Sequence, residues 1–305
     1  MLVSHGYFET PDRFQPIDTG TLVPEAFIGW LRHAMDMTED GASEMPVQRW
    51  EEGGLNISKD SLVKELALNI NVRMDGSTRQ LAVTMRTPGD EVELALGWLL
   101  SEGIIRARAD VLSCSTEDDS VTVELVPGCV DDLAQFVRPF PISSGCGLCG
   151  RETLEQFDIP SRLALSGDPW LSPKILMLLP DMLSSSQPVF QRTGGLHAAA
   201  LFDDGGRLTG LKEDVGRHNA LDKLVGSRLL TSSLPAENEV LMLSGRIGYE
   251  LIQKAAYAGF PAVAGLGAPT TMAVDAARAS GLTLIGFLRS DRFNVHTGAW
   301  RLLDD

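Results

Sequence analysis

The stretch that decides the fold runs from residue 239 to residue 292 and reads EVLMLSGRIGYELIQKAAYAGFPAVAGLGAPTTMAVDAARASGLTLIGFLRSDR. Two segments with helical patterning end at Gly259 and Gly281, where glycine is favoured at a helix C-terminus. Three short apolar runs alternate with these two segments and have the length of buried strands: 239–244, 261–267 and 282–289. Strands that alternate with helices through short connections form a parallel sheet. The pattern therefore predicts an α/β fold.

Upstream of this stretch, residues 46–140 predict a smaller α+β subdomain. LALNINVRM and RQLAVTMRT alternate apolar and polar residues around an Asp75-Gly76 turn, which is typical of a β-hairpin. The segment EVELALGWLLSEG, at 91–103, predicts a helix that Asp90 caps. VTVELV, at 121–126, predicts a further strand.

Residues 1–45 carry recurrent Pro, Gly and Asp and predict a flexible extension, with one helix between Pro24 and Met35. The third predicted part, 141–305, combines the parallel unit with a second hairpin at 197–214 and a helix from His218. The chain is thus expected to comprise an extension, an α+β subdomain and a larger α/β domain.

Composition limits the classes of function. The 305 residues are 44% hydrophobic and carry a net charge of −15, so general binding to nucleic acid or to an anionic membrane is disfavoured. The sequence contains no apolar run of the roughly 20 residues that a transmembrane helix needs. Four cysteines in a chain of this length are too few for a disulfide scaffold. We expect a cytoplasmic, reducing location.

Polar residues follow all three strands of the predicted parallel sheet. Ligands of open α/β sheets bind beyond the carboxyl ends of the strands. A helix that opens at Thr270 offers free N–H groups, and Arg246, Arg289 and Arg292 add positive charge. The pattern predicts a phosphate or pyrophosphate site; the alternative is that these glycines form turns and these arginines lie on the surface. GLGAPT, at 265–270, is neither GxGxxG nor a Walker A loop.

Cys146 and Cys149 form a CxxC pair flanked by three glycines, which predicts a mobile loop. A thiolate on such a loop can attack a sulfur donor, and the helix expected near Arg151 would lower the pKa of Cys149 most. The alternatives are a structural role, or a mixed zinc site completed by His197 or His218. The remaining cysteines are expected to be small apolar fillers: Cys114 and Cys129.

A dense polar motif, EDVGRHN at 213–219, precedes the predicted helix from His218. Asp214 or Asn219 would simply cap this helix in one interpretation. In the other, His218 and Arg217 lie in a polar pocket where Glu213 or Asp214 orients the imidazole. His197 is followed by alanines, so the His-x-Glu signature of zinc deaminases is absent.

Together these motifs resemble one family, the formate dehydrogenase accessory sulfurtransferases (FdhD). The matching segments occur in the family's order over about residues 140–298, and the segment at 87–105 is similar as well. They are SSGCGLCG, TGGLHAAALF, EDVGRHNALDKLVG, LSGRIGYELIQKAAYAGFPA, APTTMAV and GLTLIGFLR. Six motifs in order are specific, whereas residues 1–45 match nothing in the family.

The resemblance implies the role of particular residues. The family's persulfide-bearing cysteine matches Cys146, with Cys149 as its CxxC partner. His197, His218, Arg246 and Thr270 would be polar residues of the same cofactor pocket. The family's core is similar to the cytidine deaminase fold, which implies a three-layer domain. The cofactor-binding segment of the family matches six consecutive residues: Phe287, Leu288, Arg289, Ser290, Asp291 and Arg292.

The resemblance also implies partners. The family carries sulfur from a cysteine desulfurase to the molybdenum cofactor, bis(molybdopterin guanine dinucleotide), which then enters formate dehydrogenase. A GDP-like guanine nucleotide would fit the same site, no resident metal is expected, and a homodimer would suit a cofactor with two pterins. Two other hypotheses stay open: a non-catalytic cofactor chaperone, in which the thiols are incidental, and a dithiol redox protein.

Overall fold

The computed structural model describes residues 41–138, 168–236 and 238–304. They belong to one compact unit that spans Met37–Asp305. The CxxC pair and the helices expected at 24–35 and from Arg151 lie outside the described residues.

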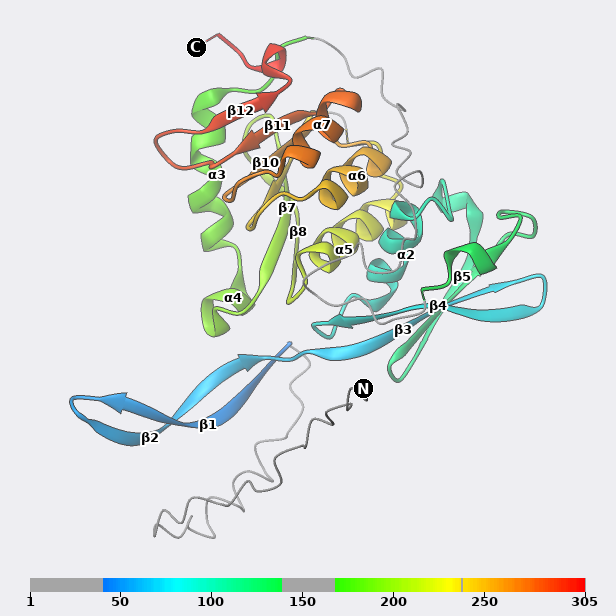
Figure 1. The fold of residues 1–305 in the computed structure, drawn as a ribbon, viewed down its shortest axis with the longest axis horizontal. Helices are drawn as coiled ribbons and strands as arrows, with labels where there is room; N and C mark the ends of the chain where they lie inside the picture. The colour runs from blue at the N-terminus through cyan, green and yellow to red at the C-terminus, as the bar shows by residue number, and fades with distance from the viewer. Residues whose placement is uncertain (1–40, 139–167, 237, 305) are drawn as a thin grey trace, which may run out of the picture. The chain divides into compact units, whose positions relative to one another are not determined.

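A six-stranded sheet organises the C-terminal part, in the order β12-β11-β10-β9-β7-β8 (Figure 1). The central strands β9, β10 and β11 run parallel to one another, as predicted, and the other pairs in the sheet are antiparallel. The predicted second hairpin is confirmed as β7 and β8. The strands are β7 (His197–Asp203), β8 (Leu208–Asp214), β9 (Glu239–Leu243), β10 (Ala262–Gly265), β11 (Thr283–Gly286) and β12 (Asn294–Thr297).

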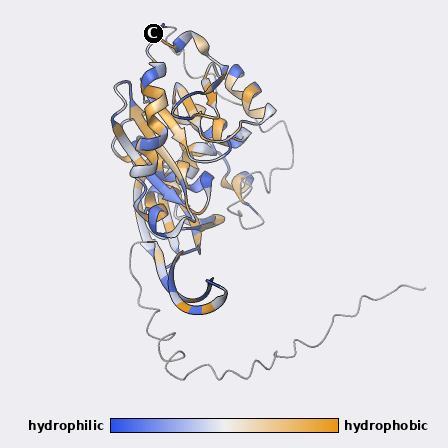
Figure 2. Cartoon of the chain, turned by 90° about the vertical axis from the view of Figure 1, so that its left-hand side faces the viewer, coloured by the Kyte–Doolittle hydropathy of each residue, from blue (hydrophilic) through white to orange (hydrophobic). Residues whose placement is uncertain are grey.

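Helices cover both faces of this sheet (Figure 1). One face carries α5 (Arg217–Leu230), α6 (Tyr249–Ala258) and α7 (Thr271–Ala279), and the other carries α3 (Pro173–Ser185) and the short α4 (Pro188–Thr193). Successive residues of the central strands alternate between the two cores, so these strands are mostly apolar (Figure 2). The exceptions are Glu239 and Thr283, the first residues of β9 and β11. The predicted α/β class is confirmed; the cytidine-deaminase-like layering stays a prediction.

A second, four-stranded sheet has the order β4-β3-β6-β5 and contains the predicted first hairpin. At its tip Asp75 and Gly76 both have positive φ, of 50° and 76°, as a two-residue hairpin turn requires. Cys114 and Cys129 are partly buried against the core, as expected of small fillers. The elements are β3 (Leu66–Met74), β4 (Ser77–Arg86), α2 (Glu91–Ser101), β5 (Val111–Glu117) and β6 (Ser120–Leu125).

The two sheets share one core because α2 and α5 cross in direct backbone contact. A Cβ atom on Gly97 would lie 1.8 Å from the carbonyl oxygen of Asp222, and one on Gly226 would lie 1.8 Å from that of Glu93. Only glycine permits this approach. A single cluster of buried residues therefore runs from the four-stranded sheet through both helices to the six-stranded sheet.

Several features differ from what the sequence indicated. No element was predicted at β5, β12 or the short α4. The antiparallel pair β1 (Ala42–Glu51) and β2 (Gly54–Val63) was not predicted, because the side chains of both strands are mostly exposed and leave no burial pattern. Asp90 does precede α2, but its left-handed backbone makes no side-chain cap, and its carboxylate pairs with Lys212 instead. Within the described ranges, no helix is long and apolar enough to cross a membrane.

Candidate binding site at the sheet edge

The structure brings the three polar strand ends together at one edge of the sheet. Gly267 N–H donates to the carbonyl of Gly245 at 3.2 Å, and Phe287 N–H donates to the carbonyl of Gly267 at 3.1 Å. These bonds continue the ladder of β9, β10 and β11 beyond the strands. Gly267 has to be glycine here, since a Cβ atom would lie 2.8 Å from the Cα atom of Arg246. The predicted edge is therefore a single continuous backbone surface.

The helix α7 begins at this edge and directs N–H groups toward it. Thr270 is the N-cap of α7, and its hydroxyl accepts a hydrogen bond from Ala273 N–H at 3.2 Å. Thr270 itself is exposed, as is Thr271 behind it. The N-terminus of α7 thus offers an anion the free N–H groups and the positive dipole end that the sequence indicated.

The three predicted arginines have different surroundings. The guanidinium of Arg289 donates to the carbonyls of Leu266 and Leu288, both at 2.7 Å, and its backbone N–H donates to Arg292 O at 2.8 Å. Arg289 therefore stabilises the turn at 289–292. Arg246 and Arg292 are exposed, and the guanidinium of Arg292 lies 3.6 Å from the Asp291 carboxylate. Arg289 is exposed as well, but its guanidinium is already engaged by two carbonyls, so Arg246 and Arg292 are the better candidates for holding an anion.

The segment 287–292 presents side chains of several kinds. Phe287 has a φ of 53°, unusual for an aromatic residue, and is 43% exposed directly after β11. Leu288 is fully buried in the core on the α3 side, so its backbone alone reaches the edge. Ser290 and Asp291 are exposed in the turn. An exposed aromatic ring beside exposed guanidinium groups suits a ligand with both a flat ring and phosphates.

His197 lies at the same edge, as the first residue of β7. Its Nδ1 atom would lie 3.3 Å from a Cβ atom placed on Gly245, so this glycine leaves the ring its space. Burial, together with the positive charges of Arg217 and Arg246, lowers the pKa of His197, against an opposing effect of Asp214. The imidazole is therefore neutral at pH 7 and can donate or accept a hydrogen bond.

His218, in the first turn of α5, faces Glu250 of α6. Its Nε2 atom lies 3.4 Å from the Glu250 carboxylate, and its buried Nδ1 atom has no partner among the described residues. Burial, with the charges of Lys254 and Arg217, lowers the pKa of His218 to about 3. This corrects the sequence prediction: the carboxylate beside His218 is Glu250, since Glu213 and Asp214 are engaged elsewhere.

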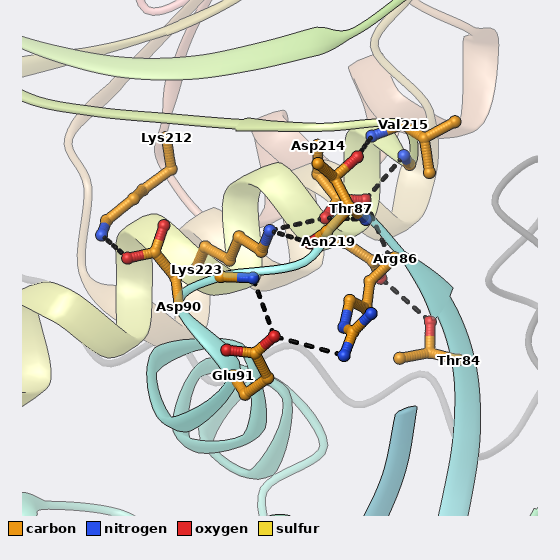
Figure 3. Close-up of polar contacts among 12 residues, drawn as sticks. Thr84, Arg86, Thr87, Asp90, Glu91, Lys212, Asp214, Val215, Asn219 and Lys223 are labelled. Carbon is orange, nitrogen blue, oxygen red and sulfur yellow. Dashed lines mark hydrogen bonds and ion pairs between the residues drawn. The ribbon is translucent and has the colours of Figure 1, made fainter. Parts of the chain in front are cut away.

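Asp214 belongs to a buried cluster that ties α5 to the end of β4 (Figure 3). Its carboxylate accepts hydrogen bonds from the backbone N–H groups of Thr87 and Gly216 and from the Asn219 amide, and it pairs with Lys223 at 2.8 Å. Lys223 also donates to the Thr87 carbonyl at 2.8 Å. We call Thr87, Asp214, Asn219 and Lys223 the α5 anchor cluster. These residues therefore hold α5 in place, but not as the predicted cap: the N-cap residue of α5 is Gly216, and no side chain caps the helix.

A second buried ion pair, Asp222 with Lys254, lies between α5 and α6. The Nζ atom of Lys254 is 2.9 and 3.0 Å from the two carboxylate oxygens, and Ser101 donates to Asp222 at 2.9 Å. Although burial disfavours its charge, the carboxylates of Asp222 and Glu250 raise the pKa of Lys254. The sequence analysis did not predict this pair or the role of Glu250. The signal available in the sequence was one charged residue among the apolar residues of each helix, Asp222 in α5 and Lys254 in α6.

Across the described ranges, the structure contains no group of three His, Cys, Asp or Glu residues able to hold an ion. The mixed zinc site considered for His197 or His218 would need Cys146 and Cys149, which lie outside these ranges.

The fold and the edge together define an α/β protein in which exposed arginines and the N-terminus of α7 gather at the carboxyl ends of the parallel strands. Residues 63–303 match the model of the FdhD/NarQ family, and the chain belongs to this family. It is 45% identical over 269 residues to the sulfur carrier protein FdhD of Streptomyces avermitilis, which covers 84% of this chain and 94% of that protein. It is 43% identical over 247 residues to the protein of the same name from Sulfurisphaera tokodaii, covering 81% and 93%.

A solved structure supports the fold. It is that of a Desulfotalea psychrophila protein described as a formate dehydrogenase accessory protein. The alignment has a TM-score of 0.70 and 23% identity, and it covers 86% of this chain and all of that one.

Proposed function

We propose that this chain is a sulfur carrier for formate dehydrogenase. It would accept sulfane sulfur from a cysteine desulfurase and deliver it to the molybdenum of bis(molybdopterin guanine dinucleotide). The observation that carries the proposal is the similarity, at 40–45% identity over most of the chain, to proteins named sulfur carrier protein FdhD. The polar edge supports it, because a guanine dinucleotide carries the phosphates that such an edge binds.

Cys146 is the proposed sulfur-bearing residue. Its thiolate attacks the outer sulfur of the desulfurase persulfide; a new S–S bond forms at Cys146 as the donor's S–S bond breaks. The donor cysteine leaves as a thiolate, so this transfer needs no external oxidant. Cys149, three residues further on, is the proposed partner thiol. Its thiolate would attack the inner sulfur of the Cys146 persulfide, so that the outer sulfur leaves as sulfide toward the molybdenum and a Cys146–Cys149 disulfide forms.

The cofactor is the proposed substrate of the edge. Arg246, Arg292 and the N-terminus of α7 at Thr270 would hold its phosphates, while Arg289 keeps the turn at 289–292 in place. Phe287 offers an exposed ring for stacking on a base. His197 and His218, both neutral at pH 7, would add hydrogen bonds without repelling or neutralising the ligand. A GDP-like nucleotide would occupy the same place.

The proposed setting follows from this chemistry. Sulfur transfer between thiols requires the reduced thiols of the cytoplasm. A cofactor with two guanine nucleotides would be matched by two such edges, and we propose a homodimer that supplies them. The proposed protein partners are the desulfurase and formate dehydrogenase.

Intact-protein mass spectrometry after incubation with a cysteine desulfurase and cysteine tests the sulfur step. We expect a reductant-labile gain of about one sulfur mass in the wild type and none in Cys146→Ala. Cys114→Ala is the matched control, because this thiol is partly buried against the core and burial raises its pKa; it should load like the wild type.

Two other outcomes would redirect the proposal. Loading that persists in Cys146→Ala and vanishes in Cys149→Ala would move the sulfur to the second thiol. Absence of loading in every protein would contradict the carrier role and favour a cofactor chaperone.

A further inference from the structure

A cavity of about 390 Å³ adjoins the polar edge on the α3 side of the sheet. Leu183 of α3, Phe190 of α4 and Leu266 after β10 give it apolar walls. His197 and Ser244 line it where it meets the edge. Its volume suits a small flat molecule, and its lining is the mixture of apolar walls and few polar groups that ligand sites have.

Gln187, another lining residue, is the unusual polar group of this cavity. It is 4% exposed, and its Nε2 atom has no hydrogen-bond partner among the described residues. A buried amide donor without a partner costs about 1–3 kcal/mol. A leucine would fill much the same volume without that cost, so the amide needs an explanation.

The local fold does not explain why the amide of Gln187 is buried. Gln187 is the N-cap residue of α4, but its side chain makes no capping bond. The N–H groups of Val189 and Phe190 donate instead to the carboxylate of Glu213, at 3.2 and 2.9 Å. The capping function is thus already performed by β8, and the amide of Gln187 is left over.

We propose that this cavity is a binding subsite for a planar heterocycle with a ring carbonyl, which accepts a hydrogen bond from Gln187 Nε2. The apolar walls would cover the faces of the ring. Ser244 adds a second donor at the cavity rim, because its oxygen already accepts the N–H of Ala198 at 2.9 Å and its own proton is available.

The position of the cavity links it to the proposed function, on which this inference rests. Leu266 forms part of its wall, and the carbonyl of Leu266 accepts the hydrogen bond from Arg289. A ligand with phosphates at the edge can therefore place a ring in the cavity. Guanine and pterin share the required chemistry, a 2-amino-4-oxopyrimidine ring, and the experiment separates them.

The test is calorimetric titration of the full chain with guanosine, neopterin, adenosine and inorganic pyrophosphate. We expect the wild type to bind guanosine or neopterin, whichever the cavity fits, and not adenosine, which lacks the ring carbonyl. Gln187→Leu should weaken binding of that ligand about tenfold, the value of one hydrogen bond, and leave pyrophosphate binding unchanged. It should also unfold at an equal or higher urea concentration, because a buried unpaired donor is gone.

The matched control is Gln191→Leu. Gln191 lies on the same helix but is exposed, and its amide donates to the carbonyl of Ser184 at 2.9 Å; its loss should leave all four titrations unchanged. The proposal is overturned if neither guanosine nor neopterin binds, if Gln187→Leu binds as the wild type does, or if Gln187→Leu is clearly less stable.

Sulfur loading of the same variants separates this inference from the proposed function. We expect Gln187→Leu to load sulfur from the desulfurase like the wild type, because loading needs no heterocycle. Normal loading without ring binding overturns only the subsite, whereas ring binding without loading in the wild type overturns only the carrier role.

Discussion

The N-terminal part of α5 carries two polar regions that differ in how completely their groups are paired. In the α5 anchor cluster, Asp214 and Lys223 are buried and make several hydrogen bonds each. At the sheet edge, His218 is nearly as buried but keeps an unpaired Nδ1 atom. Residues of the motif at 213–219 therefore have two different roles. The groups with all their hydrogen-bond partners stabilise the fold, and the group without a partner is available to a ligand.

The largest effect should come from breaking the anchor cluster. Asp214→Ala leaves the Lys223 ammonium, 1% exposed, without its carboxylate, and we expect a loss of about 3–5 kcal/mol in the free energy of unfolding. Urea denaturation measures it. As a control, Asp275→Ala removes an exposed pair with Arg278 and should cost less than about 1 kcal/mol. Equal losses in both variants would show that burial does not distinguish them.

A smaller, pH-dependent effect should come from His218. Its pKa is about 3 in the folded protein, under the influence of burial, Lys254, Arg217 and His197, and near 6.5 when unfolded. The unfolded chain binds the proton first, so stability should fall as pH falls from about 6.5 toward 3, by at most about 1.4 kcal/mol per pH unit.

His218→Gln should flatten this acid slope, whatever its stability at pH 7. Urea midpoints of the wild type and the variant at pH 7.5 and pH 5 provide the measurement. If the wild type and the variant lose the same amount of stability between pH 7.5 and pH 5, His218 is not the cause of the slope.

The smallest effect on stability is expected at the ligand side of the edge. Arg292→Ala removes an exposed side chain and should change the free energy of unfolding by less than about 0.5 kcal/mol. Its affinity for GDP should nevertheless fall several-fold, since a phosphate contact is lost. Calorimetry with GDP tests this, and an unchanged affinity would remove Arg292 from the site. Arg289→Ala, which also loses two carbonyl contacts, should lower both properties.

Prediction from sequence worked where local pattern and burial coincide. The parallel strands β9, β10 and β11 lie in two cores, so their residues form continuous apolar runs. Thr270 caps α7 as predicted, because a cap needs only neighbouring residues. Prediction from sequence failed for β1 and β2, because their side chains are mostly exposed. It also failed for the cap at Asp90, because the carboxylate of Asp90 pairs with Lys212 from a strand that is distant in sequence.

The sequence by itself determined the α/β class, the parallel unit and the edge at which polar residues gather, because these depend on patterns that repeat within a few residues. Only the tertiary structure decided which polar groups are paired. The deciding contacts join separate elements: Glu250 lies beside His218, and Lys254 lies beside Asp222. In the same way Glu213 of β8, and not Gln187, accepts the N–H groups at the start of α4. Whether a buried polar group is structural or available to a ligand depends on these partners. A local pattern of residues does not identify them, because the partners come from segments that are distant in the sequence.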